Sequence, residues 1–150
     1  MKANNGKGNV SQRDFWKTPD FVFNILDNQY SFSFDCCADV SNKKCVEFSD
    51  DFESIARTGG VAWMNPPFSK ALDMFIHFFN IVDSGVAIYR CDNLETAIWQ
   101  DLILKNSDWV FFFKGRIEYE GQQASGARFP SALIGVGLDR PVGLRGKVMS

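Results

Sequence analysis

Metal ligands and nucleotide-binding glycine motifs are scarce in this sequence of 150 residues. It has a single histidine and no Cys-x-x-Cys pair, which argues against a zinc site. It also lacks Gly-x-Gly-x-x-Gly, the motif that holds the pyrophosphate of a dinucleotide. Its cysteines, at positions 36, 37, 45 and 91, show no regular disulfide spacing. We therefore expect no bound metal, and any cofactor should lack a pyrophosphate.

Long hydrophobic runs and a strong excess of one charge are absent as well. No segment approaches the roughly 18 consecutive apolar residues of a membrane span, and the polar start MKANNGKGNVSQRD lacks the apolar core of a signal peptide. Hydrophobic residues make up 45% and aromatic residues 15%, a composition that excludes disorder. We expect a cytoplasmic protein without a membrane partner, with a mobile arm over 1–14, one domain over 15–140 and an irregular tail over 141–150.

The net charge of −2 argues against a protein that coats nucleic acid without specificity. Positive residues nevertheless gather in places. Lys114, Arg116 and Arg128 flank one glycine-containing loop, and others lie in the two termini, namely Lys2, Lys7, Arg13, Arg145 and Lys147. Folding could bring this charge to one side, where it would attract phosphate groups. The alternative is ordinary solvated surface charge.

Helical and strand patterns alternate along the chain. Thr18 and Pro19 have the residue types of an N-cap and a first helical position, and Asp92 with Glu95 matches a capping box for the last helix. Strands are predicted at 30–38, 45–48, 61–64, 85–90, 108–114, 115–119 and 132–138. Helices are predicted at 19–28, 69–83 and 93–105, and a short helix with a glycine turn at 53–60. The third helix has one narrow polar stripe, which predicts that His77 lies on the surface. The alternation predicts an α/β three-layer sandwich with a mostly parallel sheet.

The stretch over 61–69, VAWMNPPFS, carries the strongest chemical pattern. A strand runs into the tetrapeptide NPPF at 65–68 and a helix follows, which is where open α/β sheets keep their active sites. The Asn65 side chain and the Pro66 backbone each offer a carbonyl that can accept one proton of an exocyclic amine on a flat ring. Phe68 offers a face for stacking, and the prolines stiffen the turn. The alternative is a strand-to-helix turn with two structural prolines.

Carboxylates follow the first two predicted strands. Asp35 and Asp39 lie at the end of the first strand, where α/β folds place groups that contact a cofactor. Asp50 and Asp51 come directly after the second strand. A carboxylate at this position can accept both hydroxyl groups of a ribose. The sequence therefore indicates a ribose-containing cofactor, with either Asp50 or Asp51 as the ribose ligand.

Further motifs accompany NPPF in a set order. They are Trp16-x-Thr18-Pro19, Phe34-Asp35-Cys36-Cys37-Ala38-Asp39 with Asn42 and Cys45, Asn65-Pro66-Pro67-Phe68-Ser69, Arg90 with Asp92, Thr96 and Trp99, Gly115-Arg116-Ile117, and Phe129-Pro130-Ser131. In this combination the chain resembles the small phage-type DNA N6-adenine methyltransferases, the Dam family. NPPF alone is shared with several amino-methyltransferases, including those that modify glutamine, whereas the combination is much more specific. The resemblance runs from Trp16 to about Gly137.

The resemblance implies transfer of a methyl group from S-adenosylmethionine to N6 of adenine in DNA. It implies a Rossmann-like class I methyltransferase sandwich for the domain over 15–140, with the last strand inserted antiparallel. By position, the catalytic residues are Asn65, Pro66, Pro67 and Phe68; the cofactor-binding residues are Trp16, Thr18, Pro19, Asp35, Cys36, Ala38, Asp39, Asp50 and Asp51; and the DNA-binding residues are Ser69, Lys114, Arg116 and Arg128. Asp35 and Asp39 would line the methionine end of the cofactor. A phage enzyme of this kind would act in the host cytoplasm, in evasion of restriction.

Three features depart from the commonest pattern of that family. Phe68 replaces the more frequent Tyr and keeps a ring for stacking. Cys37 brings no glycine to the cofactor strand. No insertion is large enough for a separate recognition domain, which leaves the loop over 120–130, the termini or a second copy of the chain to read DNA sequence. Two other functions stay open: an inactive methyltransferase-like phage protein that binds a host protein or DNA, and a methyltransferase of protein glutamine.

Overall fold

A seven-stranded mixed sheet forms the centre of the computed structural model, which describes residues 16–120 and 128–149. Its strands, in spatial order, are β2 (Glu47–Phe48), β1 (Phe34–Asp35), β3 (Ala62–Met64), β4 (Gly85–Arg90), β8 (Ser131–Val136), β5 (Trp109–Phe113) and β9 (Gly146–Met149). Two further strands, β6 (Ile117–Glu118) and β7 (Arg128–Phe129), pair with each other as a separate antiparallel ribbon.

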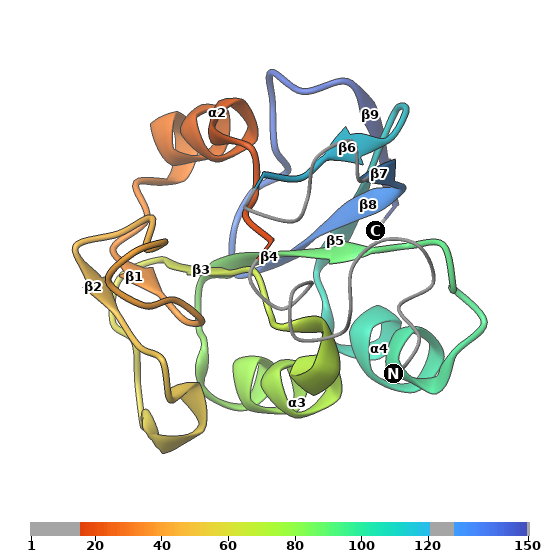
Figure 1. Cartoon of the computed structure of the whole chain (residues 1–150). Coiled ribbons are helices and arrows are strands. Elements are labelled where there is room, and N and C mark those ends of the chain that lie inside the picture. Colours follow the sequence, from red (N-terminus) through yellow and green to blue (C-terminus); the bar gives the residue numbers. More distant parts are fainter. Residues whose placement is uncertain (1–15, 121–127, 150) are drawn as a thin grey trace, which may run out of the picture.

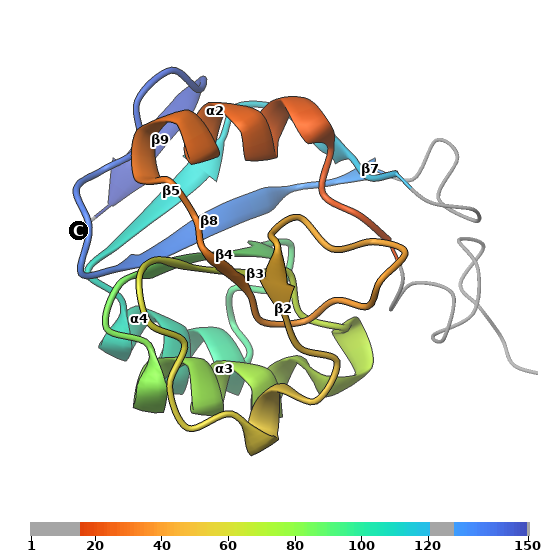
Figure 2. The ribbon, with the colours of Figure 1, turned by 90° about the vertical axis from the view of Figure 1, so that its left-hand side faces the viewer.

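Helices cover both faces of the sheet, as Figures 1 and 2 show. α2 (Asp20–Tyr30) lies on one face. On the opposite face lie α3 (Ala71–Ile81) and a π-helical stretch, η3 (Ile98–Ile103), that continues into α4 (Leu104–Asn106). Two short 3-10 helices, η1 (Phe52–Ser54) and η2 (Phe68–Lys70), precede β3 and α3. The mixed α/β class predicted from the sequence is confirmed.

The directions of the strands differ from the prediction of a mostly parallel sheet. β1 runs parallel to β2 and β3, and β3 runs parallel to β4. β8 is antiparallel to both of its neighbours, β4 and β5, and β9 is antiparallel to β5. Six residue pairs join β4 to β8, whereas three join β3 to β4. The mostly parallel sheet is not confirmed, because the strands at one side turn into loops after two or three residues and the longest pairings form around β8.

Alternating side chains of the central strands fill two hydrophobic cores. Val86 and Ile88 of β4 pack in the core under α2, while Ala87 and Tyr89 pack in the core that contains the apolar face of α3. Phe75 of α3 is fully buried there, and burial of a side chain of this kind stabilises a fold by about 1.5–3 kcal/mol. The continuous apolar run of β4 thus reflects a strand that is buried on both faces.

Two element boundaries predicted from the sequence are wrong. The sequence predicts a strand from residue 30, but Tyr30 is the last residue of α2, and Ser31 ends that helix in a left-handed conformation with φ of 57°. The predicted capping box also fails, because the carboxylate of Asp92 pairs with Arg90, 2.6 Å away, and the helix begins further along the chain. In both places a local contact or turn overrides the sequence pattern.

The two ends of the chain bring further corrections. The predicted irregular tail over 141–150 contains β9, which pairs with β5. Thr18 is not the N-cap of α2, since Pro19 occupies that position and no side chain caps the helix. The predicted mobile arm over 1–14 and most of the predicted DNA-reading loop lie outside the described residues. Within residues 16–120 and 128–149, no helix has both the length and the apolar character that crossing a membrane requires.

Candidate active site

The carboxyl ends of β1 and β3 bring the main predicted site residues together. The two strands are parallel, and Asp35 lies opposite Trp63. The backbone N–H of Cys36 donates to the carbonyl of Trp63 at 2.9 Å, so the chain after β1 stays beside the chain that leads into Asn65. Because neighbouring parallel strands end at the same edge of a sheet, Asp35 and Asn65 line one space.

A hollow of about 170 Å³ opens at this edge, and we call it the acidic hollow. Its walls come from the loop after β1, the segment after β2, and η2 with α3. Four lining residues carry carboxylates, namely Asp39, Asp50, Asp51 and Glu53. Phe52 and Met74 supply apolar surface, and Lys70 adds one positive charge. This combination suits a ligand that has hydroxyl donors and a flat apolar group.

A smaller hollow of about 30 Å³, which we call the inner hollow, adjoins the acidic hollow. Cys37 and Asn42 line both spaces. The other walls of the inner hollow include Trp16, Thr18, Asp35 and Asn65. A space of this size holds about one water molecule. The two hollows therefore offer one ligand a wide outer compartment and a narrow inner one.

Two buried polar atoms beside the inner hollow lack a hydrogen-bond partner among the described residues, namely Trp16 Nε1 and Thr18 Oγ1. Thr18 is fully buried, and Trp16 is 5% exposed. A buried polar group without a partner costs about 1–3 kcal/mol, so native proteins contain few of them. The hydroxyl of Thr18 belongs to a residue that lines the inner hollow, where a bound ligand would satisfy it.

Asp35 is a deeply buried carboxylate at this site, with 2% of its surface exposed. Its Oδ2 accepts the backbone N–H of Lys44 at 2.9 Å, and its Oδ1 accepts that of Cys37 at 3.4 Å. Removal from water raises its pKa to about 6, although these hydrogen bonds and the charge of Lys44 act in the opposite direction. A buried carboxylate of this kind favours a cationic ligand, because the cation replaces lost solvation.

Asp39 braces its own loop. Its Oδ1 accepts the hydroxyl of Ser41 at 2.6 Å and the backbone N–H groups of Ser41 and Asn42 at 2.8 and 3.2 Å. In the reciprocal hydrogen bond, the Oδ1 of Asn42 accepts the backbone N–H of Asp39 at 2.8 Å. The Ser41 hydroxyl is the largest cause that lowers the pKa of Asp39. Asp39 thus fixes the wall shared by the two hollows, and its direct contact with a cofactor stays a prediction.

The NPPF turn holds Asn65 in one orientation. The Nδ2 of Asn65 donates to the backbone carbonyl of Trp16 at 3.1 Å. Its Oδ1 lies on the other branch of the planar amide, away from that carbonyl, and is the side-chain atom that can accept from a ligand. Pro66 is buried, and the carbonyl of Pro67 accepts the N–H of Lys70 at 3.0 Å at the start of η2. The turn is therefore braced at both of its ends.

Phe68 belongs to an aromatic cluster that the sequence did not predict. Its ring centroid lies 6.2 Å from that of Trp16, 6.3 Å from that of Tyr89 and 5.5 Å from that of Phe129. These contacts are edge-to-face or tilted, whereas Trp16 stacks on Phe129 with an interplanar angle of 21°. Within the described part of the chain, the half-buried Phe68 ring is thus positioned without a parallel ring stacked on it.

Arg90 covers this aromatic cluster with a positive charge. Its guanidinium carbon lies 5.5 Å from the centroid of the Phe68 ring and 4.8 Å from that of Phe129. Asp92 orients the guanidinium through two hydrogen bonds, 2.8 Å from Nε and 2.6 Å from a terminal nitrogen. Contacts of a cation with aromatic faces stabilise by about 0.5–2 kcal/mol each. The Arg-x-Asp motif is visible in the sequence, but its contact with Phe68 arises only in the folded chain.

The remaining predicted residues fall into separate places. Cys36, Ala38, Asp50, Asp51 and Pro67 line the acidic hollow. Pro19 is buried and lines neither hollow. Ser69, Lys114 and Arg116 are exposed and lie outside both hollows. The backbone of Arg128 belongs to β7, and its side chain lies outside the described part of the structure.

His77 ties α3 to the segment before β3. Its Nε2 lies 2.7 Å from the carbonyl oxygen of Ile55, and its ring packs edge-on against Phe52 with centroids 4.8 Å apart. The side chain is half-buried rather than fully at the surface, because its predicted polar stripe faces η1. Among the residues that the structure describes, no group of three or more His, Cys, Asp or Glu side chains could hold a metal ion.

Comparison with known proteins agrees with this site. The chain matches the family of DNA N-6-adenine-methyltransferase (Dam) over residues 5–134. A protein of Haemophilus phage HP1 (strain HP1c1) named DNA N-6-adenine-methyltransferase is 25% identical over 117 residues, which cover 73% of this chain and 68% of that protein. The family match includes both hollows, the NPPF turn and the aromatic cluster, and it ends before β9. The chain therefore belongs to the DNA N-6-adenine-methyltransferase (Dam) family.

Proposed function

We propose that this protein methylates N6 of adenine in DNA and uses S-adenosylmethionine as the methyl donor. Membership of the Dam family supports both the reaction and the substrate. One geometric observation carries the proposal: Asp35 and Asn65 both line the inner hollow. A donor held by the first residue and an amine held by the second would meet there.

The residues around the two hollows fit the chemical groups of S-adenosylmethionine. Its ammonium would bind the buried carboxylate of Asp35, and the unpartnered hydroxyl of Thr18 would bind the same amino-acid end. The ribose hydroxyls would donate to Asp50 or Asp51, and the adenine ring would lie against Phe52. When bound, the cofactor supplies a methyl group on an electrophilic sulfonium.

The NPPF turn would orient the amine of the target adenine. The Oδ1 of Asn65 and the backbone carbonyl of Pro66 would accept the two N6 protons, which favours the nitrogen lone pair for attack. N6 would accept the methyl group that the cofactor supplies in place of the carbon–sulfur bond, and the surplus proton of N6 would pass to water. No strong base is required, because the nitrogen becomes acidic only as it gains the carbon. Alignment of the reacting atoms would supply most of the acceleration.

The adenine has to leave the duplex to reach this turn. Flipping a base costs a few kcal/mol of unpairing and unstacking. Stacking on an aromatic side chain stabilises the flipped base by about 1–3 kcal/mol, which offsets part of this cost. In the NPPF turn, Phe68 supplies the ring. Arg90 and Asp92 act as positioning residues in this account, because they hold Phe68 rather than the base.

The order of the strands supports a Rossmann-like class I methyltransferase fold. β8 lies antiparallel between β4 and β5, which themselves run in the same direction. β1 and β3, whose ends carry Asp35 and Asn65, are neighbours in the parallel part of the sheet. Such an enzyme would act on DNA in the cytoplasm of a host cell. A homodimer stays a prediction, to be tested by sedimentation with and without DNA.

The test is transfer of a radiolabelled methyl group to unmethylated plasmid DNA, followed by digestion to nucleosides. The label should appear in N6-methyl-2′-deoxyadenosine. Label in modified cytosine, or in a protein glutamine instead of DNA, would contradict the proposal. Cofactor binding without transfer to either duplex or single-stranded DNA would instead support the inactive binding protein.

A further inference from the structure

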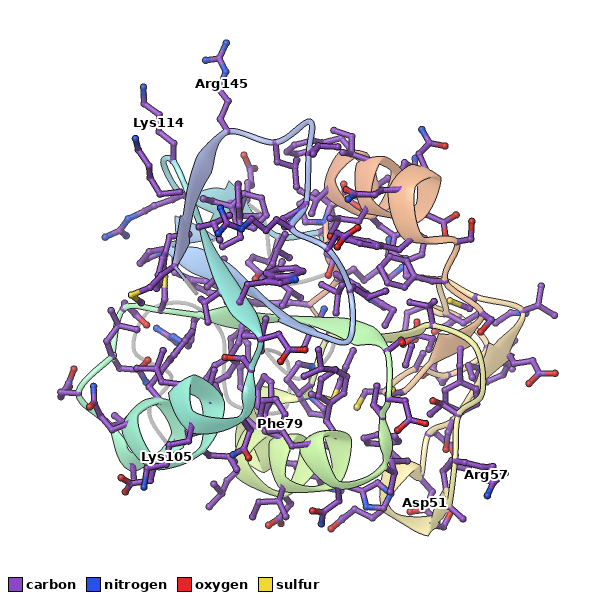
Figure 3. The ribbon with its side chains drawn as sticks, turned by 180° about the vertical axis from the view of Figure 1, so that it is seen from behind. Asp51, Arg57, Phe79, Lys105, Lys114 and Arg145 are labelled. Atoms are coloured by element: carbon purple, nitrogen blue, oxygen red, sulfur yellow. The ribbon has the colours of Figure 1, made fainter. Side chains whose placement is uncertain are left out.

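Four basic residues gather where β5 ends and β9 begins. We call Lys114, Arg116, Arg145 and Lys147 the basic edge. All four are exposed. The backbone N–H of Lys114 donates to the carbonyl of Arg145 at 3.0 Å, and Lys147 lies opposite Phe112 in the pairing of β5 with β9. Figure 3 shows the side chains of Lys114 and Arg145 projecting from the same edge of the molecule. Strand pairing thus joins positive charge from two distant parts of the sequence.

None of the ion pairs within residues 16–120 and 128–149 includes a residue of the basic edge. The two ion pairs found there join Lys44 to Asp20 and Arg90 to Asp92. The whole chain has a net charge of −2, so four exposed positive charges at one edge make its charge distribution strongly uneven. An exposed concentration of one charge attracts a partner of the opposite charge and speeds its association.

The basic edge lies at the same end of the sheet as the candidate active site. β8 is antiparallel to both β4 and β5, so those two strands point the same way. Arg90 ends β4 and Lys114 follows the end of β5. The pKa of Asp92 is lowered mainly by its hydrogen bond to Arg90, and the charge of Arg116 adds to this lowering. Arg116 therefore lies near the pair that positions Phe68.

We propose that the basic edge binds the phosphodiester backbone of DNA, beside the nucleotide whose adenine enters the active site. This inference rests on the proposed function and extends it to a surface that lies partly outside the family match, because that match contains Lys114 and Arg116 but ends at residue 134, before Arg145 and Lys147. Phosphate contacts by Lys and Arg orient a protein on DNA without reading its sequence. The edge would supply affinity in a chain that has no large recognition insertion.

The test is the salt dependence of DNA affinity, measured by fluorescence anisotropy with the full chain and an unmethylated duplex oligonucleotide. Each phosphate contact contributes about 0.9 to the slope of log Kobs against log salt concentration. The double variant Arg145→Gln with Lys147→Gln should reduce the magnitude of the slope by about 2, and it should weaken binding at low salt by about tenfold or more. Lys114→Gln with Arg116→Gln should act in the same direction.

A matched control removes the same charge elsewhere. Arg57→Gln with Lys105→Gln neutralises two exposed cations that Figure 3 shows at the opposite side from Lys114 and Arg145. The control should leave the slope and the rate of methyl transfer unchanged. Thermal unfolding of every variant should match that of the wild type, since all these side chains are exposed, and cofactor affinity should stay the same.

Each result distinguishes this inference from the proposed function. Equal changes of slope in the basic-edge variants and in the control would reflect net charge alone and would overturn the inference. An unchanged slope in the basic-edge variants of an active enzyme would overturn it too, while the proposed function stands. A wild-type chain that neither binds nor methylates DNA would overturn both.

Discussion

The inner hollow and the acidic hollow adjoin, yet they hold their polar groups in different surroundings. Asp35 and Thr18 of the inner hollow are 2% and 0% exposed, whereas Asp50 and Asp51 of the acidic hollow are exposed to water. An electrostatic contact strengthens as water is removed from it. We therefore expect a few contacts in the inner hollow to determine catalysis, and several weaker contacts in the acidic hollow to share the binding of the cofactor.

The sharpest test of the inner hollow is Asn65→Ala, which should lower kcat by about 100–1000-fold. Its Oδ1 is one of two acceptors for the reacting amine, and loss of one preorganised group of this kind has that effect in enzymes. The measurement is steady-state methyl transfer with saturating DNA. Cofactor affinity should be nearly unchanged. Asn80→Ala, an exposed site on α3, is the matched control and should keep full activity.

Asp35→Asn should weaken cofactor affinity by about 10–100-fold, because a hydrogen bond to a charged group contributes about 1.5–3 kcal/mol. The same change should stabilise the empty protein at pH 7 by up to about 3 kcal/mol, since it removes a carboxylate whose pKa burial raises to about 6 from an ordinary 3.8. Calorimetric binding and chemical unfolding provide the two readouts. A variant that is both less stable and unimpaired in binding would contradict the role of Asp35.

The pH dependence of cofactor affinity should show the same carboxylate. Because the pKa of Asp35 is about 6, affinity should be constant above about pH 7 and fall by up to tenfold per unit below pH 6. Stability changes in the opposite sense. The contribution of a raised pKa is fully present below about pH 3.8 and is lost as the pH rises through 6. Asp35→Asn should remove this titration from both curves.

Arg90→Met should lower kcat/KM for DNA by about fivefold, which corresponds to the loss of one or two cation–aromatic contacts. Methionine keeps much of the packing but neither the charge nor the bonds to Asp92. Arg90→Lys should restore part of the loss, because it keeps the charge but not the forked geometry. If Arg90→Met lowers only the melting temperature and leaves kcat/KM unchanged, Arg90 does not position Phe68 for the reaction.

The acidic hollow should respond least to single changes. Of Asp50→Asn and Asp51→Asn, the one that removes the ribose ligand should weaken cofactor affinity by about three- to tenfold, and the other by less than about twofold. Glu53→Gln, in the same hollow, is the control. Losses as large as that expected for Asp35→Asn would remove the distinction between the two hollows.

The local patterns of the sequence predicted much of this site. β4 spans the residues predicted for it, because a continuous apolar run is typical of a strand that is buried on both faces of a sheet. The nearness of Asp35 and Asn65 follows from two parallel strands that end at one edge. Both inferences need only the order of the elements and the chemistry of a few residues.

Contacts between distant segments could not be predicted in the same way. Two contacts depend on how loops pack: the hydrogen bond from Asn65 to the Trp16 carbonyl, and the position of Arg90 over Phe68 and Phe129. Loop packing produces no periodic pattern in the sequence from which such contacts could be predicted. The same holds for β9, whose short mixed sequence becomes a strand only because β5 offers it an open edge. Tertiary pairing of this kind overrides local propensity.

The most direct test of the two-hollow site is a crystal structure of the protein with S-adenosylhomocysteine, the product left by the methyl donor. The amino-acid end of the ligand should lie against Asp35 and Thr18, its ribose against Asp50 or Asp51, and its sulfur towards Asn65. A ligand bound outside the two hollows, or bound with its sulfur away from the NPPF turn, would contradict this prediction.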